Sequence, residues 1–495
     1  MKKIYLLLTF AAVLCLSSCN LDINEDPNYP SRSDVTPDLV FPAAENAVAA
    51  AVGDAMFNYG GFFAQYFEQR PEANQYNNEA ELNIDESTNL FDRCYRTLYA
   101  GALADIQDVM ERTENKSNLF ACTVLRAYAF QILVDNLDQV PYTEALQGSA
   151  NTNPAWDLGE DVYKGVLAEM DAAEAALEGD PMTLTDPLLE KNLNQWRGFA
   201  NALRLRMYLR LIDGGINASE YQSKAVALVN ADNFFTGNVA WDVYSNAEGQ
   251  YNPWYDVTRA LGTKNHVASY PIVSYYMATN DPRMEYAIMK NDAGEYVGQI
   301  PGAKTVYKSW GVDWKNKDVS AIDYAPASCA PIYLFTQSEL QFLIAETQLR
   351  WGNKSDAKVA YEAGVLADFA SRGMSTAYGP FMAGNRVNWS TQASDADRLN
   401  LIYMQKWAAL FYRDHMEAWS EVRRTDVPTT CTYSARQVFE DPTVYSAGQM
   451  IVPALNYIQV GGLCKRVPYP STARQLNKNT PASKLLSDRV FWDAK

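Results

Sequence analysis

A stretch in the second half of the chain decides the fold. Residues 336–370 read TQSELQFLIAETQLRWGNKSDAKVAYEAGVLADFA. Thr336 and Glu339 have the spacing of a capping box, in which each side chain binds a backbone N–H group of a helix's first turn. Gly352 interrupts the apolar periodicity, which then resumes, and the small Gly364 suits a place where two helices cross. The stretch therefore predicts two helices joined by a turn, a helical hairpin over 338–370.

The same helical spacing of apolar residues continues on both sides of this hairpin. It extends from residue 43 to about 230 and from 336 to about 424, with companion hairpins expected at 90–137 and 158–213 and helices at 90–113, 118–137 and 194–213. Asp157 and Glu160 mark the start of a further helix. The hairpin at 338–370 resembles a tetratricopeptide unit. We therefore predict a mainly α fold with a scaffold of tetratricopeptide-like helical hairpins.

A loop-rich segment, 232–330, separates the two helical blocks. It contains 4 of the 11 Trp and 10 of the 31 Tyr residues of the chain. Turn signals such as Asn252-Pro253 interrupt it repeatedly, and two alternating runs, 295–300 and 304–310, predict a minor β-hairpin. Because long loops on a rigid scaffold commonly carry binding groups, we expect this insertion to hold a ligand site.

Composition excludes several classes of protein. The 495 residues include 42 Lys and Arg, 59 Asp and Glu and only 2 His, which gives a net charge of −17. Nucleic-acid binding relies on Lys and Arg that displace counterions, so we expect no nucleic acid as a partner. Two histidines cannot form a His-rich zinc site, and no cofactor motif is present. We expect no cofactor and no metal, although a site made from Asp and Asn oxygens stays open.

The first residues have the pattern of an export signal. Two lysines precede an uncharged stretch, 4–16, which is too short to span a bilayer but fits the apolar region of a signal peptide. This stretch ends in Leu16-Ser17-Ser18-Cys19, which resembles a bacterial lipobox. We expect a signal peptide at 1–18, a lipid on Cys19 and a tether at 19–42. An ordinary signal peptide with an incidental cysteine is the alternative.

The acidic residues 20–27 resemble the tags that send Bacteroidetes lipoproteins to the cell surface. We therefore expect a protein anchored by its lipid in the outer membrane and facing the exterior. Loss of Lys2 and Lys3 with the signal peptide changes the net charge from −17 to −19. This charge favours a neutral ligand over a polyanion.

The cysteines other than the lipidated one give no disulfide framework. Cys15 is removed with the signal peptide, which leaves Cys94, Cys122, Cys329, Cys431 and Cys464, an odd number without a C-x-x-C pair. We expect most of them to be buried free thiols. An exported location also allows a Cys431–Cys464 disulfide.

Several short motifs, in their order and spacing, resemble the SusD/RagB family of surface lipoproteins. They are Leu98-Tyr99, Arg126-Ala127-Tyr128, Asp138-Gln139-Val140-Pro141-Tyr142, Asn280-Asp281-Pro282-Arg283, Gln405-Lys406-Trp407, Glu417-Ala418-Trp419-Ser420-Glu421-Val422-Arg423-Arg424-Thr425 and Arg466-Val467-Pro468-Tyr469-Pro470. The Arg-Arg-Thr and Arg-x-Pro-Tyr-Pro forms resemble one large branch of this family. The chain departs from the family at Asp138-Gln139, where many relatives have an aromatic residue and Gly, and at His415.

The resemblance implies one helical domain over 43–495, with the insertion at 232–330 and a C-terminal segment at 425–495. It also implies a partner, a SusC-like TonB-dependent transporter in the outer membrane, on which the lipoprotein acts as a hinged lid. The ligand would be an oligosaccharide that is bound and handed over. A peptide ligand is the alternative.

Aromatic side chains beside polar ones are the candidate ligand contacts, because sugar rings place their C–H faces on aromatic rings. Trp310 and Trp314, with Gly311 between them, are the first choice for a platform. The other candidates are Tyr76, Trp254, Tyr255, Trp241 and Tyr251. For each ring, burial in a small core is the alternative.

Other conspicuous residues have a structural explanation. Trp407, Trp419, Arg423 and Arg424 lie at helical spacing with apolar residues, which indicates packing and buried ion pairs. His415, expected in the same helix, is assigned a structural role. His266 lies in the insertion and is a weaker candidate for ligand contact.

The sequence gives little support for catalysis. It has no G-x-S-x-G elbow, H-E-x-x-H pair or Gly-rich phosphate loop, so we expect no enzyme. A lipid-anchored glycan-degrading enzyme is the alternative, since a glycosidase needs only two suitably spaced carboxylates. The alternating strands and helices of a barrel glycosidase are absent from the pattern.

Overall fold

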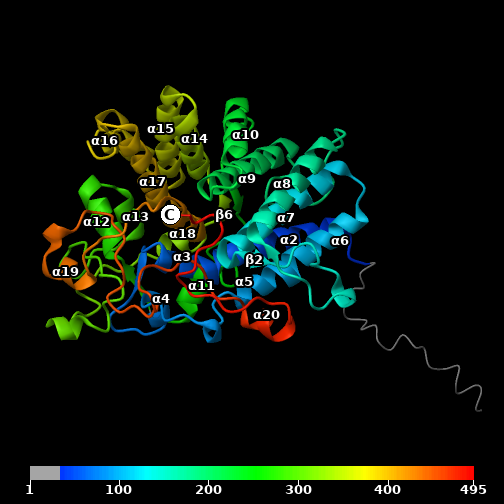
Figure 1. The fold of residues 1–495 in the computed structure, drawn as a ribbon. Helices are drawn as coiled ribbons and strands as arrows, with labels where there is room; N and C mark the ends of the chain where they lie inside the picture. The colour runs from blue at the N-terminus through cyan, green and yellow to red at the C-terminus, as the bar shows by residue number, and fades with distance from the viewer. Residues whose placement is uncertain (1–33, 263, 495) are drawn as a thin grey trace, which may run out of the picture.

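The computed structural model describes residues 34–262 and 264–494, and helices dominate it (Figure 1). The predicted signal peptide, the lipidation site Cys19 and tether residues 19–33 lie outside the described residues. The helices are α2 (Pro37–Gly53), α3 (Ala55–Phe63), α4 (Asn77–Ala80), α5 (Asp92–Arg96), π-helical η3 (Thr97–Leu103), α6 (Ala104–Arg112), α7 (Lys116–Leu137), α8 (Gly159–Ala175), α9 (Leu193–Asp213), α10 (Ala218–Ala231), α11 (Pro253–Ala260), α12 (Tyr270–Thr279), α13 (Arg283–Ala287), α14 (Gln337–Trp351), α15 (Lys354–Ser371), α16 (Tyr378–Met382), α17 (Asp395–Leu410), α18 (His415–Thr425), α19 (Ala435–Glu440) and α20 (Ser471–Leu476). The strands are β1 (Phe67–Gln69), β2 (Gln139–Val140), β3 (Asp157–Leu158), β4 (Val239–Trp241), β5 (His266–Ala268) and β6 (Ile332–Phe335). The mainly α fold is confirmed.

The hairpin predicted at 338–370 forms as α14 and α15. Gly364 is needed where the two helices touch, because a Cβ atom there would lie 2.9 Å from the Phe342 ring. Only half of the expected capping box exists. Thr336 accepts the backbone N–H of Glu339 at 3.0 Å, but the Glu339 carboxylate binds the guanidinium of Arg206 at 2.7 Å instead of capping its own helix.

The other predicted helices are present with small changes at their ends. Helices α7 and α9 match the expected ranges, and the range 90–113 is filled by α5, η3 and α6 in succession. The start signal at Asp157 was wrong, because α8 begins at Gly159 without a side-chain cap. Asp157 accepts the backbone N–H groups of Tyr142 and Thr143, each at 2.9 Å, and so fixes the preceding loop.

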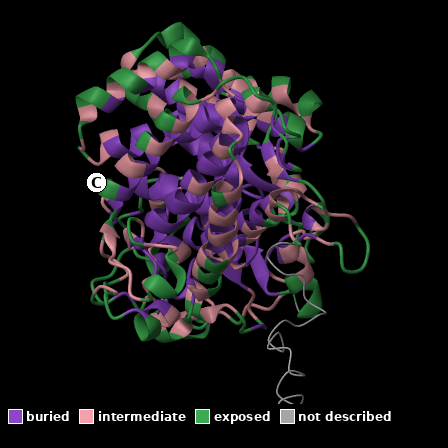
Figure 2. Cartoon of the chain, turned by 90° about the vertical axis from the view of Figure 1, so that its right-hand side faces the viewer, coloured by how far each residue is buried: buried purple, intermediate pink, exposed green. Residues whose placement is uncertain are grey.

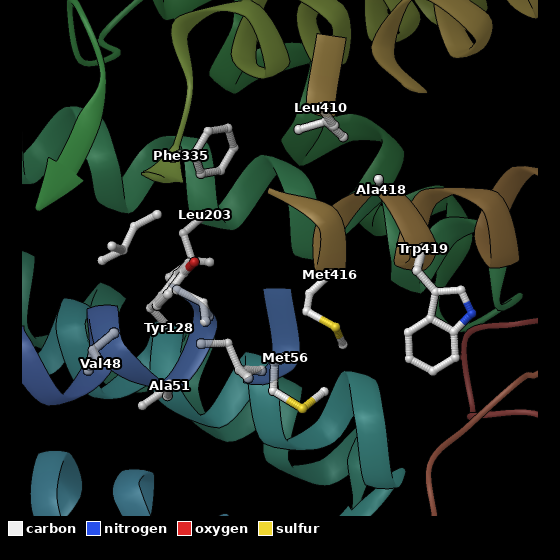
Figure 3. Close-up of a cluster of buried hydrophobic side chains, with 14 of the residues drawn as sticks. Val48, Ala51, Met56, Tyr128, Leu203, Phe335, Leu410, Met416, Ala418 and Trp419 are labelled. Atoms are coloured by element: carbon white, nitrogen blue, oxygen red, sulfur yellow. The ribbon is translucent and has the colours of Figure 1, made fainter. Parts of the chain in front are cut away.

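The main core lies where α2, α3, α7, α9 and α18 meet. Figure 3 shows Val48, Met56, Tyr128, Leu203 and Trp419 directed into this region from these helices. Buried residues fill the centre of the molecule, while exposed residues lie on outer helices and loops (Figure 2). Helix α7 is long and apolar enough to cross a membrane, but 89% of its most apolar window is buried inside the protein. Its composition is that of a core helix.

Buried ion pairs connect the two helical blocks. Arg210 of α9 binds Asp135 of α7 and Glu417 of α18, each at 2.6 Å. Arg424 of α18 binds Asp213 at the end of α9 at 2.5 Å. All four residues Trp407, Trp419, Arg423 and Arg424 are buried, which confirms the expected structural role. Arg424 forms ion pairs, and the Arg423 guanidinium packs on the Trp419 ring at 3.7 Å.

His415 does not share a helix with Trp407, because the chain turns between α17 and α18 and His415 begins the second. Its imidazole is fully buried and stacks on Phe57 at 3.7 Å between ring centroids. Nδ1 donates to the carbonyl oxygen of Phe57 at 2.8 Å, and Nε2 accepts the N–H of Tyr412 at 2.9 Å. Both nitrogens are occupied inside the core, which confirms the structural role.

The strands form two-stranded antiparallel pairs, and two of these fix the insertion to the scaffold. β4 and β6 lie at the two ends of the insertion and pair with each other, Val239 opposite Phe335 and Trp241 opposite Ile332. β1 pairs with β5, with Phe67 opposite Ala268. The expected β-hairpin is wrong: 295–300 and 304–310 do not pair with each other, and Tyr307–Trp310 is a short 3₁₀ helix.

The described cysteines are all free. Cys329 is exposed and the other four are buried, so most are buried thiols as expected, and the Cys431–Cys464 disulfide does not form. Within the described ranges, no three His, Cys, Asp or Glu side chains are grouped to hold a metal ion.

Candidate functional site: an aromatic groove

A groove of about 590 Å³ lies between the insertion and the C-terminal segment. Four aromatic side chains line it: Tyr270, Tyr296, Trp314 and Phe439. Met277, which is 54% exposed, also lines it. We name this feature the aromatic groove. Of the described residues that line it, none is Asp, Glu, His, Lys or Arg.

The first wall of the aromatic groove is α12, placed by the β1–β5 pair that precedes it. The segment 296–300 runs beside the start of α12, where the N–H of Tyr270 donates to the carbonyl oxygen of Gln299 at 2.8 Å. A Cβ atom on Gly298 would lie only 2.6 Å from the Cα atom of Tyr270. Glycine at this position therefore lets the two segments approach closely and brings Tyr296 to the groove beside Tyr270.

The opposite wall contains Trp314, one of the two rings predicted as a platform. Trp314 packs on Tyr307 at 4.6 Å and on Phe439 at 5.9 Å between centroids. Trp310 packs on the same two rings, at 5.5 Å and 5.4 Å. Both tryptophans are half-buried in a small core with Val438 and Ile451. Only Trp314 lines the groove, so the two do not form the joint platform that the sequence suggested.

Polar contacts hold the segment that carries Trp314. The N–H of Asn316 donates to the Glu72 carboxylate at 3.1 Å, and the N–H of Glu72 donates to the Asn316 side chain at 3.1 Å. Lys304 donates to Asn77 at 2.8 Å. These bonds join the polar loop 69–78 to the insertion, so two segments far apart in the sequence form one surface layer.

Tyr76, a predicted ligand contact, belongs to this loop but not to the aromatic groove. Its half-buried ring stacks on the imidazole of His266 at 4.9 Å. His266 is fully buried and cannot reach a ligand in this structure. Its Nε2 donates to Asn58 Oδ1 at 2.6 Å and its Nδ1 accepts the Tyr324 hydroxyl at 2.6 Å. Burial lowers the pKa of His266 to about 3, and burial also lowers the pKa of His415 to about 3.

These neutral histidines predict a pH dependence of stability. Between pH 6.5 and 3 the unfolded chain binds a proton at His266 that the folded protein does not, so the free energy of unfolding falls as the pH falls. The contribution approaches about 1.4 kcal/mol per pH unit and per histidine. Glu68 contributes the opposite pH dependence. Burial raises its pKa to about 8, so the folded protein binds this proton before the unfolded chain does, and this contribution to the free energy of unfolding grows as the pH falls.

The effect of His266 is therefore measured as the difference in pH dependence of stability between His266→Gln and the unmodified protein. Urea unfolding at pH 7, 6 and 5 should show a smaller loss of stability towards low pH in His266→Gln than in the unmodified protein. Equal slopes in the two proteins would mean that His266 is protonated in the folded state.

The remaining predicted residues are not brought into the aromatic groove. Trp241 and Trp254 are buried, 6% and 3% exposed, so the expectation that they offer ring faces to a ligand is corrected. Trp254 Nε1 donates to Asn58 Oδ1 at 3.3 Å inside the core. Tyr251 and Tyr255 are half-buried and lie 5.3 Å apart, with the Arg259 guanidinium 4.8 Å from the Tyr251 ring. Their role as ligand contacts stays a prediction, as does that of Tyr76.

Sequence reasoning missed Tyr270, Tyr296, Met277 and Phe439 as groove residues. The surplus of aromatic residues in the insertion was a signal for the first two. Phe439 had no signal of this kind, because it lies on the short helix α19 of the C-terminal segment.

Comparisons with known proteins place this architecture in a family. The chain belongs to the SusD-like family. The model of this family, described as starch-binding associating with outer membrane, matches residues 31–443. The family resemblance drawn from the motifs is thereby confirmed. A search among curated protein sequences gave no match.

Solved structures share the fold at low sequence identity. A chitin-binding protein is 19% identical, with 93% of this chain and 100% of that chain covered and a TM-score of 0.73. A chitin-binding SusD homologue from Flavobacterium johnsoniae is 19% identical, with 92% and 98% covered and a TM-score of 0.71. A SusD homologue from Bacteroides thetaiotaomicron is 22% identical, with 93% and 99% covered and a TM-score of 0.72.

Proposed function

We propose that this protein binds oligosaccharides in the aromatic groove at the cell surface and passes them to a SusC-like TonB-dependent transporter. The observation that carries the proposal is a groove of about 590 Å³ lined by four aromatic rings. Rings of this kind accept the C–H faces of sugars, while the hydroxyl groups of Tyr270 and Tyr296 supply hydrogen bonds. The family description and the two chitin-binding relatives support a glycan as ligand.

The chemistry of the groove supports binding without catalysis. Hydrolysis of a glycosidic bond needs one carboxyl group as acid and a second as nucleophile or base. The described residues that line the groove include no carboxylate, imidazole or amine. A sugar held there would contact only rings, aliphatic groups and hydroxyls, and would be released without chemical change.

The location at the outer membrane rests on two observations. The family description names association with the outer membrane, and the sequence Leu16-Ser17-Ser18-Cys19 has the form of a lipidation site. We propose that Cys19 carries the lipid and that the domain faces the exterior, where it meets both the ligand and the transporter.

Affinity electrophoresis of the soluble domain tests the proposal. Native gels that contain soluble starch, neutral glycol chitin, xylan or β-glucan should retard the protein with at least one polysaccharide, and a reducing-sugar assay of the same mixtures should detect no product. Release of reducing ends would favour the enzyme alternative. Binding to a peptide library with no retardation by any glycan would favour the peptide alternative.

Filling the groove should weaken binding strongly without unfolding the protein. Ala278 lines the groove on α12 and is half-buried, so Ala278→Trp would place an indole in the space proposed for a sugar. We expect affinity for the retarding glycan to fall at least about tenfold, a change of about 1.4 kcal/mol. Ala363→Trp is the matched control, since Ala363 is a half-buried alanine on α15. Unchanged affinity in Ala278→Trp, measured by calorimetry, would place the glycan elsewhere.

A further inference from the structure

A second pocket lies on the other side of α12 from the aromatic groove and has a different chemistry. Its volume is about 510 Å³. It is formed by the loop 385–392, the start of α17 and the C-terminal segment 428–449. Its lining includes the amide side chains of Asn385, Gln392, Asn400 and Gln449 and the guanidinium of Arg386. We name it the polar pocket.

Helix α12 forms a wall of both the polar pocket and the aromatic groove. Ser274 of α12 lines the groove, and its neighbour Tyr275 lines the polar pocket. The backbone N–H of Gly448, which also lines the polar pocket, donates to Ser274 Oγ at 3.1 Å. A Cβ atom on Gly448 would lie 3.0 Å from the Tyr275 ring, so the wall is closely packed at this point. A ligand long enough to pass over this wall would contact both the groove and the pocket.

Arg386 gives the polar pocket a charge that the aromatic groove lacks. It is exposed, and no described carboxylate forms an ion pair with its guanidinium. The acidic residue in the lining, Asp397, is already engaged. Its Oδ2 accepts the N–H and the hydroxyl of Ser394 at 2.9 Å and 2.7 Å, which caps α17. In a chain with a net charge of −17, an unpaired guanidinium among amide groups is suited to a ligand with hydroxyls and one anionic group.

We propose that the polar pocket is a second glycan subsite, which takes a sugar unit that carries a carboxylate or sulfate group, with Arg386 as the residue that binds the anion. The inference rests on the proposed function, because the aromatic groove is assigned to the neighbouring neutral part of the same oligosaccharide. Arg386 would then favour chains with an anionic substituent over chains without one.

Matched pairs of oligosaccharides test the proposal. Each pair shares its backbone and differs in its anionic groups: tetragalacturonic acid and its methyl ester, xylotetraose with and without a glucuronic acid branch, and a carrageenan oligosaccharide before and after desulfation. Calorimetry should find at least one anionic member that binds about fivefold or more tightly than its neutral partner at low salt. This preference should shrink at physiological salt, because exposed charges are screened.

Two variants separate this inference from the proposed function. Arg386→Gln should remove the preference for the anionic member and leave the affinity for the neutral one unchanged. Arg436→Gln, a similar change at an exposed arginine on α19 that is ion-paired to Glu440, should preserve the preference. If no anionic member binds more tightly than its partner, or if the preference survives in Arg386→Gln, the polar pocket is not this subsite. Binding of neutral glycans that is lost on filling the groove would still support the proposed function.

Discussion

Replacing Arg424 with methionine should lower the free energy of unfolding by about 3–5 kcal/mol, the range observed when one partner of a buried ion pair is removed. The Arg424 guanidinium is fully buried and lies 2.6 Å from Glu346, 2.6 Å from Glu421 and 2.5 Å from Asp213. Without it, these carboxylates stay in the core with less positive charge to compensate them.

The loss of stability caused by Arg424→Met should become smaller as the pH falls. Burial raises the pKa of Glu346, but the Arg424 guanidinium outweighs this effect and the pKa lies at about 2. Loss of the guanidinium lets this pKa rise, so protonation relieves the variant at pH 5 more than at pH 8. Urea unfolding at both pH values measures the difference. Arg436→Met, at an exposed pair, should change stability by less than about 1 kcal/mol. A loss of stability below about 1 kcal/mol in Arg424→Met would contradict the role of the buried ion pairs in stability.

Replacing Trp314 with alanine should lower glycan affinity at least about tenfold, because one of the four aromatic rings of the groove is removed. The same change at Trp310 is the matched control. Both indoles are half-buried and both pack on Tyr307 and Phe439, so each substitution should lower stability by a similar amount, about 1–3 kcal/mol. Only Trp314 lines the groove.

Calorimetry on the two variants, with thermal unfolding in parallel, therefore separates packing from ligand contact. Trp310→Ala should retain binding at temperatures where it is folded. Equal losses of affinity in both variants would show that the local core, and not the exposed face of Trp314, supports binding. A loss confined to Trp310→Ala would place the ligand on the other side of this core.

The helices were predictable because their signal is local. The spacing of apolar residues and the glycine between α14 and α15 both act over a few residues, and they indicated the correct hairpin. Glu339 shows the limit of such signals. Its local role as a cap was replaced by an ion pair with Arg206 of α9, because a buried arginine is costly without a carboxylate partner.

The groove was only partly predictable because its walls come from distant segments. The aromatic surplus of the insertion pointed to Trp314, but it could not separate Trp314 from Trp254. Trp254 is buried because Asn58 of α3 accepts its indole N–H and because Phe67 stacks on it at 5.7 Å. These contacts depend on how the insertion folds back on the N-terminal helices, which no local pattern reveals. Phe439 was missed for the same reason.

A crystal structure of the domain with the glycan that retards it most strongly tests the central claim most directly. We predict sugar rings in the aromatic groove with their C–H faces against Trp314 and Phe439, and no covalent change in the sugar. Ordered sugar on the surface around Tyr76 and Tyr255, with the aromatic groove empty, would contradict the assignment of the site.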